Sequence, residues 1–320
     1  MLRVVWKSSL AFLTALLLTC AGLSLMSPAR PVAASSYSVG GGIGEKWWSA
    51  GGPNGSLGQP VSPEFDGLRD GGASQMFQGG TIFWSWPTGS HIVRGGLLGK
   101  FQSLGFESGT LGYPLGDEID GLRNGGAVQM FQAGKLYWTP TGAHLVRGAI
   151  DSKWSSTGWE NGSLGYPITD EFSNLRDGGA SQIFERGTVF WSGWTGAHVV
   201  RGAILGKYSD TGFENGILGY PTTDEFSNLR DGGASQVFQS GGVYWSWSTA
   251  AHMVRGAILA DYERDNFEEG PDGYPTGDEY QRGADAYQGF QGVLKHWYGQ
   301  WGQYADVLND SYYDYYFSHL

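Results

Sequence analysis

Four histidines and four arginines recur in one short motif, and they are the side chains in this chain best suited to chemistry. The motif reads TGSHIVRGGL at 88–97, TGAHLVRGAI at 141–150, TGAHVVRGAI at 195–204 and TAAHMVRGAI at 249–258. A histidine binds metals or moves protons near neutral pH, and an arginine binds a carboxylate through parallel hydrogen bonds. The residues are His91, His144, His198 and His252, with Arg94, Arg147, Arg201 and Arg255.

The histidines have three possible roles. A metal site requires them to converge within a few ångström, and the corresponding position in the fifth copy of the motif is Tyr37. The interpretation we favour is a half-buried histidine that bonds a backbone group within its own repeat. Contact with a ligand is the third possibility. The arginines are expected to pair with a recurring Asp-Glu, first seen at Asp117-Glu118, and so to join loops or neighbouring repeats.

Catalytic motifs are missing from the sequence. It contains no GxSxG elbow, and its single cysteine, Cys20, lies near the N-terminus. The Gly-Gly pairs follow Asp or Asn, as in turns, and the DGG segments lack the acid spacing of a calcium loop. A catalytic pair of carboxylates needs two different environments, whereas near-identical repeats offer the same one. We therefore expect no enzyme activity and no cofactor.

Tryptophans divide into two groups. The recurring ones, Trp84, Trp138, Trp191 and Trp245, end a predicted strand and are assigned to the core together with Phe77 and its equivalents. Trp86, Trp194 and Trp247 lie in the following loop, where the second copy has Thr139-Pro140 instead. A sugar ring stacks its C–H face on a flat indole while nearby polar groups bind its hydroxyls. The loop tryptophans either bind carbohydrate in this way or pack against the next repeat.

Residues 1–34 have the features of an export signal. Arg3 and Lys7 precede an apolar run from Ser8 to Met26, and small residues end at Ala34, where we expect cleavage. An uncleaved anchor and, more weakly, a lipoprotein site at Cys20 are the alternatives. Without this segment the chain has 17 basic and 31 acidic residues and no cysteine. It is therefore expected to avoid nucleic acid and anionic lipid, to have no membrane span, and to be stable without disulfides.

A repeat of about 54 residues dominates the rest of the chain. Gly-x-Pro begins at residues 58, 112, 165, 219 and 273, and Gln-x-Phe begins at 75, 129, 182, 236 and 288. Each copy contains three or four strand-like segments. Residues 203–210 read as a short helix.

The first residues of the repeat region resemble the end of a repeat. YSVGGGIGEKW at 37–47 aligns without gaps to HLVRGAIDSKW at 144–154, and the fifth copy departs from the pattern after Trp297. Such a split is typical of a ring in which the first strand completes the last unit. The predicted fold is all-β, a five-bladed propeller with short helices over 35–298, closed by an N-terminal strand. Residues 299–320 form an aromatic and acidic tail that is either loose or competes to supply that strand.

The motifs resemble those of the LGFP-repeat family. They are LGQP at 57–60, LGYP at 111–114, 164–167 and 218–221, the DE pairs, GGAxQxF and the TGAHxVRG segments. The resemblance covers about residues 37–298, although Tyr or Gln replaces the Phe of LGFP and the fifth copy reads PDGYP. It implies a secreted module of the cell envelope of mycolic-acid-containing Actinobacteria that holds proteins on wall polysaccharide, in particular arabinogalactan. It also implies a five-bladed propeller.

The leading functional prediction is a non-enzymatic module that binds cell-wall polysaccharide through the loop tryptophans, the histidines and the arginines. The alternative is a protein-interaction scaffold that binds another envelope protein. An envelope hydrolase or acyltransferase is the third and least supported hypothesis.

Overall fold

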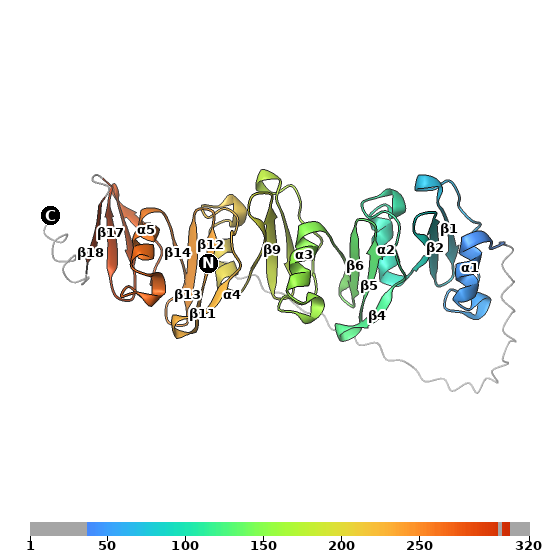
Figure 1. Cartoon of the computed structure of the whole chain (residues 1–320), viewed down its shortest axis with the longest axis horizontal. Coiled ribbons are helices and arrows are strands. Elements are labelled where there is room, and N and C mark those ends of the chain that lie inside the picture. The colour runs from blue at the N-terminus through green and yellow to red at the C-terminus, as the bar shows by residue number, and fades with distance from the viewer. Residues whose placement is uncertain (1–36, 300–302, 308–320) are drawn as a thin grey trace, which may run out of the picture. The chain divides into compact units, whose positions relative to one another are not determined.

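Five α-helices, nine short 3-10 helices and five small antiparallel sheets occur in the part of the chain that the computed structural model describes, residues 37–299 and 303–307 (Figure 1). The word helix below refers to the α-helices. The predicted leader 1–34, with Cys20, lies outside these residues. Each helix is followed by one sheet, and we call a helix together with its sheet a unit. The fold is thus mostly β with recurring short helices, and each Gly-x-Pro and Gln-x-Phe motif falls within one unit.

Each unit begins with its α-helix, and three or four strands follow in chain order. Unit 1 contains α1 (Gly41–Ser49), β1 (Ala73–Phe77), β2 (Gly80–Ser85) and β3 (Gly89–Val93). Unit 2 contains α2 (Gly95–Ser103), β4 (Ile119–Leu122), β5 (Gly126–Phe131), β6 (Gly134–Thr139) and β7 (Gly142–Val146). Unit 3 contains α3 (Gly148–Ser156), β8 (Ala180–Phe184), β9 (Gly187–Ser192) and β10 (Gly196–Val200).

The last two units each have four strands. Unit 4 contains α4 (Gly202–Asp210), β11 (Phe226–Leu229), β12 (Gly233–Phe238), β13 (Gly241–Ser246) and β14 (Ala250–Val254). Unit 5 contains α5 (Gly256–Arg264), β15 (Tyr280–Arg282), β16 (Asp285–Gly289), β17 (Leu294–Tyr298) and β18 (Gln303–Val307). Strands that are consecutive in the chain are neighbours in each sheet, so every connection within a sheet is a short hairpin or turn.

The helix predicted at 203–210 is confirmed as α4. It begins at Gly202, whose φ of +57° is unfavourable for any residue with a Cβ, and the same conformation recurs at the first residue of each of the five α-helices. This requirement explains the recurring Arg-Gly pair. Ile204 and Tyr208, four residues apart, lie on one face of α4 and are buried.

Helices α2 to α5 each join two sheets in one hydrophobic core. The core around α4 contains Val243 of its own unit and also Phe190 and Val200 of unit 3. The ring of Phe190 meets that of Tyr208 edge to face, with 5.0 Å between their centroids. A unit therefore completes the core of its neighbour, as expected of repeats that cannot bury an apolar face alone.

The predicted N-terminal strand is wrong. Residues 37–40 form no strand, and Gly41 begins α1 because this segment corresponds to the junction of a strand with a helix in the other units. The outer strand of the fifth sheet is β18, from the segment predicted to be a tail or a competing strand. The alignment itself holds, since the Ser38 carbonyl accepts a hydrogen bond from Gln75 as the Leu145 carbonyl does from Gln182. The five sheets do not confirm a closed five-bladed ring.

Consecutive units are joined by a repeated set of polar contacts. A helix lysine pairs with the aspartate of the next unit, and the same aspartate accepts a backbone N–H from the preceding sheet. The lysine–aspartate pairs are Lys46–Asp117, Lys100–Asp170, Lys153–Asp224 and Lys207–Asp278. The Tyr of each LGYP-type motif donates its hydroxyl to a turn carbonyl of the preceding unit, as Tyr220 does to Arg176 at 2.7 Å.

Units 1 and 5 differ at these junction positions. Unit 1 has Gln59 and Pro63 where the other units have the tyrosine and the aspartate, and unit 5 has Asp261 where the others have the helix lysine. In unit 5 this aspartate pairs within its own unit, with Lys295 at 2.8 Å and with Arg264. Lys295 is fully buried at the strand position that Val243 occupies in unit 4.

Lys295 lies among three aspartates. Its Nζ is 2.8 Å from Asp261, 2.7 Å from Asp265 and 2.9 Å from Asp272. Burial alone lowers the pKa of the Lys295 ammonium, but the hydrogen bonds to these carboxylates outweigh it and raise the pKa above its usual value. Unit 5 therefore contains a charged core cluster that the other units lack.

Candidate functional site: a cavity repeated at three junctions

Three cavities of the same composition lie where one unit meets the next. Their volumes are about 330 Å³ at the junction of units 1 and 2, about 370 Å³ at units 2 and 3, and about 430 Å³ at units 3 and 4. The shared lining is an arginine, the first turn of a helix, a glutamate and a tryptophan. These residues are Arg94, Glu118 and Trp138; Arg147, Glu171 and Trp191; and Arg201, Glu225 and Trp245.

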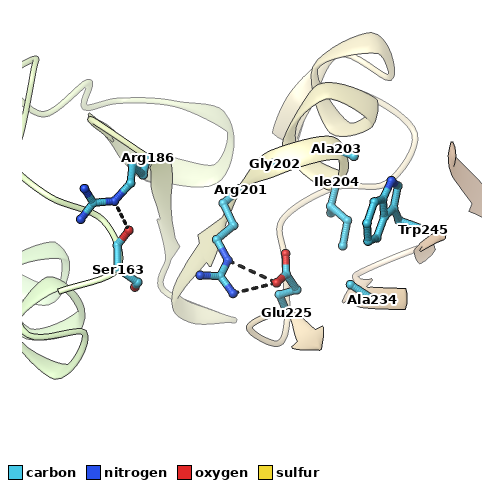
Figure 2. Close-up of a pocket in the computed structure, with 9 residues that line it drawn as sticks. All are labelled: Ser163, Arg186, Arg201, Gly202, Ala203, Ile204, Glu225, Ala234 and Trp245. Carbon is cyan, nitrogen blue, oxygen red and sulfur yellow. Dashed lines mark hydrogen bonds and ion pairs between the residues drawn. The ribbon is translucent and has the colours of Figure 1, made fainter. Parts of the chain in front are cut away.

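The third cavity shows how the chain positions these groups (Figure 2). Arg201 follows β10 and precedes the first residue of α4, so the Arg-Gly turn fixes its backbone at the cavity. Glu225 comes from the Asp-Glu segment that follows the LGYP motif of unit 4. Trp245 lies on β13 and Ile204 on α4, and in Figure 2 they form the side of the cavity opposite Arg186.

An ion pair lies within each cavity lining. Arg201 donates from Nη2 and Nε to one carboxylate oxygen of Glu225, at 2.8 and 3.2 Å. Arg147 and Glu171 are 2.9 Å apart, and Arg94 and Glu118 are 3.2 Å apart. The predicted pairing of the arginines with the Asp-Glu segments is therefore confirmed, and the glutamate is the partner. The same pair, Arg255–Glu279 at 2.7 Å, joins units 4 and 5.

The first cavity differs slightly in its electrostatics. Burial, followed by a hydrogen bond with Asp120, raises the pKa of the Glu118 carboxyl above its usual value, although Arg94 opposes the shift. Arg94 also pairs with Asp120 at 2.9 Å, and unit 3 has Ser173 in place of that aspartate.

The three tryptophans of the cavities were assigned to the core from the sequence, and that assignment is wrong in part. Trp138, Trp191 and Trp245 are half-buried and line the cavities. The sequence contains a signal for this cavity role, because the helix residue that faces the indole is small in each of these units. A Cβ placed on Gly96 lies 2.3 Å from Trp138, and the third and fourth units have only Ala149 and Ala203 there.

The histidines lie outside the cavity linings. His91, His198 and His252 are half-buried, and their Nε2 atoms lie 2.7–2.8 Å from a threonine carbonyl in the same hairpin. The interpretation as a residue that bonds its own repeat is thus confirmed for these three. The Nδ1 atoms of all four, His144 included, lie 3.4–3.7 Å from the junction aspartate of the next unit.

The loop tryptophans are the most exposed large hydrophobic side chains in the described part of the chain. Trp86, Trp194 and Trp247 are 84–87% exposed at the β2–β3, β9–β10 and β13–β14 turns, as expected for loop positions. They are separate from the cavity linings. Trp247 packs edge to face on Trp245, with 5.1 Å between centroids, so in unit 4 the loop indole touches the cavity tryptophan.

The cavities suit an uncharged polar ligand. Each offers an apolar indole surface, guanidinium donors and carboxylate acceptors, and contains an Arg–Glu pair whose two charges offset each other. The third cavity has a second arginine, Arg186, in its lining. A polyhydroxylated ring uses all three, because its C–H face packs on the indole and its hydroxyls both donate and accept. Within 37–299 and 303–307, no three His, Cys, Asp or Glu side chains group closely enough to hold a metal ion. None of the helices in those ranges has the length and apolarity to span a membrane.

Known structures give only weak likenesses. They include a 2S albumin seed protein from Dolichos (11% identity, 59% of this chain, 90% of that chain) and a plant lectin with two metal-binding sites from Cicer arietinum (12%, 62%, 92%). A hemopexin-fold protein, CP4 from cow pea, is similar at 12% identity, covering 59% of this chain and 91% of its own. All three have a TM-score of 0.16, which is too low to support an argument about this chain.

No curated protein matches the sequence. The family comparison is decisive, because the LGFP repeat model matches residues 57–109, 111–162, 164–216 and 218–270, well over half of the chain. These matches span the LGYP-type motifs, the Gln-x-Phe strands, the Arg-Gly turns and the helices described above. The chain belongs to the LGFP-repeat family.

Proposed function

We propose that this protein is a non-enzymatic module of the cell envelope that binds wall polysaccharide, such as arabinogalactan, at several junctions between units. The observation that carries the proposal is the recurrence of the Arg–Glu–Trp cavity at three successive junctions. A repetitive polymer presents the same sugar many times, so several weak sites on one chain reinforce one another. The LGFP-repeat family and the leader-like segment 1–34 support a role outside the cytoplasm.

The loop tryptophans extend the proposed binding surface. Their indoles are exposed in three units, and Trp247 touches the cavity tryptophan Trp245. A sugar chain longer than one residue places one ring in a cavity and stacks the next on a loop indole. The half-buried histidines support the hairpins that present these loops.

Retention on immobilised arabinogalactan tests the proposal with two triple variants. Glu118→Gln, Glu171→Gln and Glu225→Gln together remove the acceptors and ion pairs of the cavities, and retention should fall at least tenfold. Trp86→Ala, Trp194→Ala and Trp247→Ala together remove only exposed side chains, and retention should fall by a smaller factor.

Asp177→Asn is the matched control for charge. Asp177 pairs with Arg176 at 3.3 Å, outside the three cavities, and this variant should bind as the parent does. Circular dichroism confirms that each variant is folded. Absence of retention by the parent protein, or equal retention by both triple variants and the parent, refutes the proposal.

A protein-interaction scaffold is the second candidate, and exposed apolar side chains favour it. Residues that follow the Asp-Glu segment, or its equivalent in unit 1, are large and 43–50% exposed in the first four units: Phe65, Ile119, Phe172 and Phe226. This candidate predicts capture of another envelope protein that alanine substitutions at these four positions abolish while polysaccharide retention is unchanged.

A further inference from the structure

A different kind of cavity lies on another part of the first junction. It has a volume of about 420 Å³ and shares no lining residue with the Arg–Glu–Trp cavities. Unit 1 supplies one wall from its sheet, and unit 2 supplies the other from the segment after α2. The lining is Phe65, Leu68, Ser74, Met76, Thr81 and Phe83, with residues 105–108.

The walls of this cavity are mainly aromatic and apolar. Phe83 is buried, and its ring centroid is 5.8 Å from that of Phe106 across the junction. Phe65 and Met76 are both about two-fifths exposed, so they form the rim of the cavity. An organic group with an apolar body can therefore enter from solvent and contact aromatic rings from two units.

One carboxylate is set into these apolar walls. Glu107 is only 5% exposed, and its Oε1 accepts a hydrogen bond from Ser108 Oγ at 2.9 Å. Arg69 donates from Nη1 to the backbone carbonyl of Glu107 at 3.0 Å, and its own charge is paired with Asp70 at 3.2 Å. Glu107 is the one charged residue among those that line this cavity, so the lining carries a single negative charge.

The aromatic residue before this glutamate is held in an unfavourable backbone conformation. Phe106 has φ of +53°, a region that costs free energy for any residue with a bulky side chain. Unit 1 has Gly52 at the equivalent position with the same backbone conformation. The turn therefore forms with glycine and does not itself require an aromatic residue. The centroid of the Phe106 ring lies 5.7 Å from that of Phe101. The Phe106 ring also lines the cavity.

The same pairing recurs in later units. Trp159, Phe213 and Phe267 have φ between 51° and 54°, and each is followed by a buried glutamate: Glu160, Glu214 and Glu268. A strained aromatic residue beside a buried carboxylate is therefore a repeated feature of the junctions. It is independent of the arginines and tryptophans on which the proposed function rests.

We propose that the cavity beside Glu107 binds small organic cations, specifically protonated amines with an aromatic or aliphatic body. A carboxylate shielded from water attracts an ammonium group more strongly than an exposed one does. Aromatic rings add favourable contact with both the cation and its apolar body. A neutral alcohol of the same shape gains the apolar contact but lacks the charge interaction.

Methionine methyl groups report on this cavity individually. Met76 lies on its rim, Met130 occupies the equivalent strand position in unit 2, and Met253 lies in β14 and serves as an internal control. The experiment titrates ¹³C-methyl-methionine-labelled protein with phenethylammonium, and separately with 2-phenylethanol. The Met76 signal should shift and saturate, with at least fivefold tighter binding of the cation, while the Met253 signal stays in place.

Glu107→Gln is the decisive variant. It should remove the preference for the cation and leave the affinity for the alcohol unchanged. Glu214→Gln makes the same change two units away and should leave the Met76 titration unaltered. If Glu107→Gln does not fold, Phe65→Ala at the exposed rim replaces it and should weaken both probes at least threefold.

Three results overturn the inference: no movement of the Met76 signal, equal affinity for the two probes, or an unchanged cation preference in Glu107→Gln. An unaltered affinity for both probes in Phe65→Ala has the same meaning when that variant is used. Arabinogalactan retention in the presence of phenethylammonium should be unaffected, so failure here is distinguishable from failure of the proposed function.

Discussion

At the scale of single residues, Lys295 makes the core of unit 5 different from the cores of the other units. Its ammonium is fully buried, and removal of the lysine leaves Asp261, Asp265 and Asp272 without it in a poorly hydrated place. Lys295→Met should therefore lower the free energy of unfolding by about 3–5 kcal/mol, as for other buried charge clusters that lose one partner. Urea unfolding measures the change.

Lys135→Met is the matched control at this scale. Lys135 pairs with Asp151 at 2.8 Å on a half-buried surface, so its loss should cost no more than about 1 kcal/mol. Equal losses in the two lysine variants would contradict the interpretation of the Lys295 cluster.

Two glycines of α4 test whether a position requires glycine for its backbone conformation or for lack of space. Neither Gly202 nor Gly206 of α4 has an atom within 4 Å of an added Cβ, but only Gly202 has a positive φ. Gly202→Ala should cost about 1–2 kcal/mol, because the left-handed conformation penalises a Cβ. Gly206→Ala should stabilise the protein by about 0.5–1 kcal/mol, because alanine favours a helix interior. Thermal unfolding of both variants tests this, and changes of the same sign in both would exclude it.

At the scale of elements, the junctions depend on the aspartates that join a helix to the next sheet. Burial raises the pKa of Asp117, but hydrogen bonds from Lys46 and the Ile92 amide outweigh it and hold the pKa below its usual value. The same balance, with Lys207 and the Met253 amide, lowers the pKa of Asp278. A carboxyl with a depressed pKa in the folded state stabilises the fold above the pKa of the unfolded chain, and this contribution is lost as the pH falls through the folded value.

The folded protein should therefore lose stability as the pH falls below about 4, the usual aspartate pKa. The midpoint of urea unfolding, followed from pH 7 to pH 2, measures this loss. Asp117→Asn together with Asp278→Asn should lower stability at pH 7 and flatten the acid side of the profile. An acid limb as steep as that of the parent would mean that these aspartates are not its source.

Elements that depend on local sequence were predictable, and those that depend on partners were not. The five copies were predicted from motif spacing, and the helix at 203–210 from apolar periodicity. The pairing of Arg201 with an acidic segment was predicted because both recur in the repeat. Residues 37–40 were misread as a strand, although their alignment was correct, because the strand–helix boundary is fixed by the φ of Gly41. The cavity role of Trp245 depends on Ala203, which lines the same cavity from α4, and this arrangement forms only once α4 lies on its sheet.

At the scale of the whole molecule, the proposed binding depends on the number of working cavities. Glu171→Gln alone should lower retention on arabinogalactan by a moderate factor, and the triple glutamate variant by a much larger one, because linked sites multiply their effects. Titration calorimetry with a short oligosaccharide should show fewer sites in each variant and the same affinity per remaining site. Complete loss of polymer binding in Glu171→Gln would instead indicate one working site.

The junction residues of units 1 and 5 differ from those of the interior units, and this difference determines which units can be added or removed. Units 2, 3 and 4 each carry both a helix lysine for the following unit and an aspartate for the preceding one, whereas Pro63 and Asp261 break that pattern in units 1 and 5. An interior unit can therefore be duplicated or excised by recombination with every remaining lysine still opposite an aspartate. Each such step would add or remove one Arg–Glu–Trp cavity, and with it one proposed binding site.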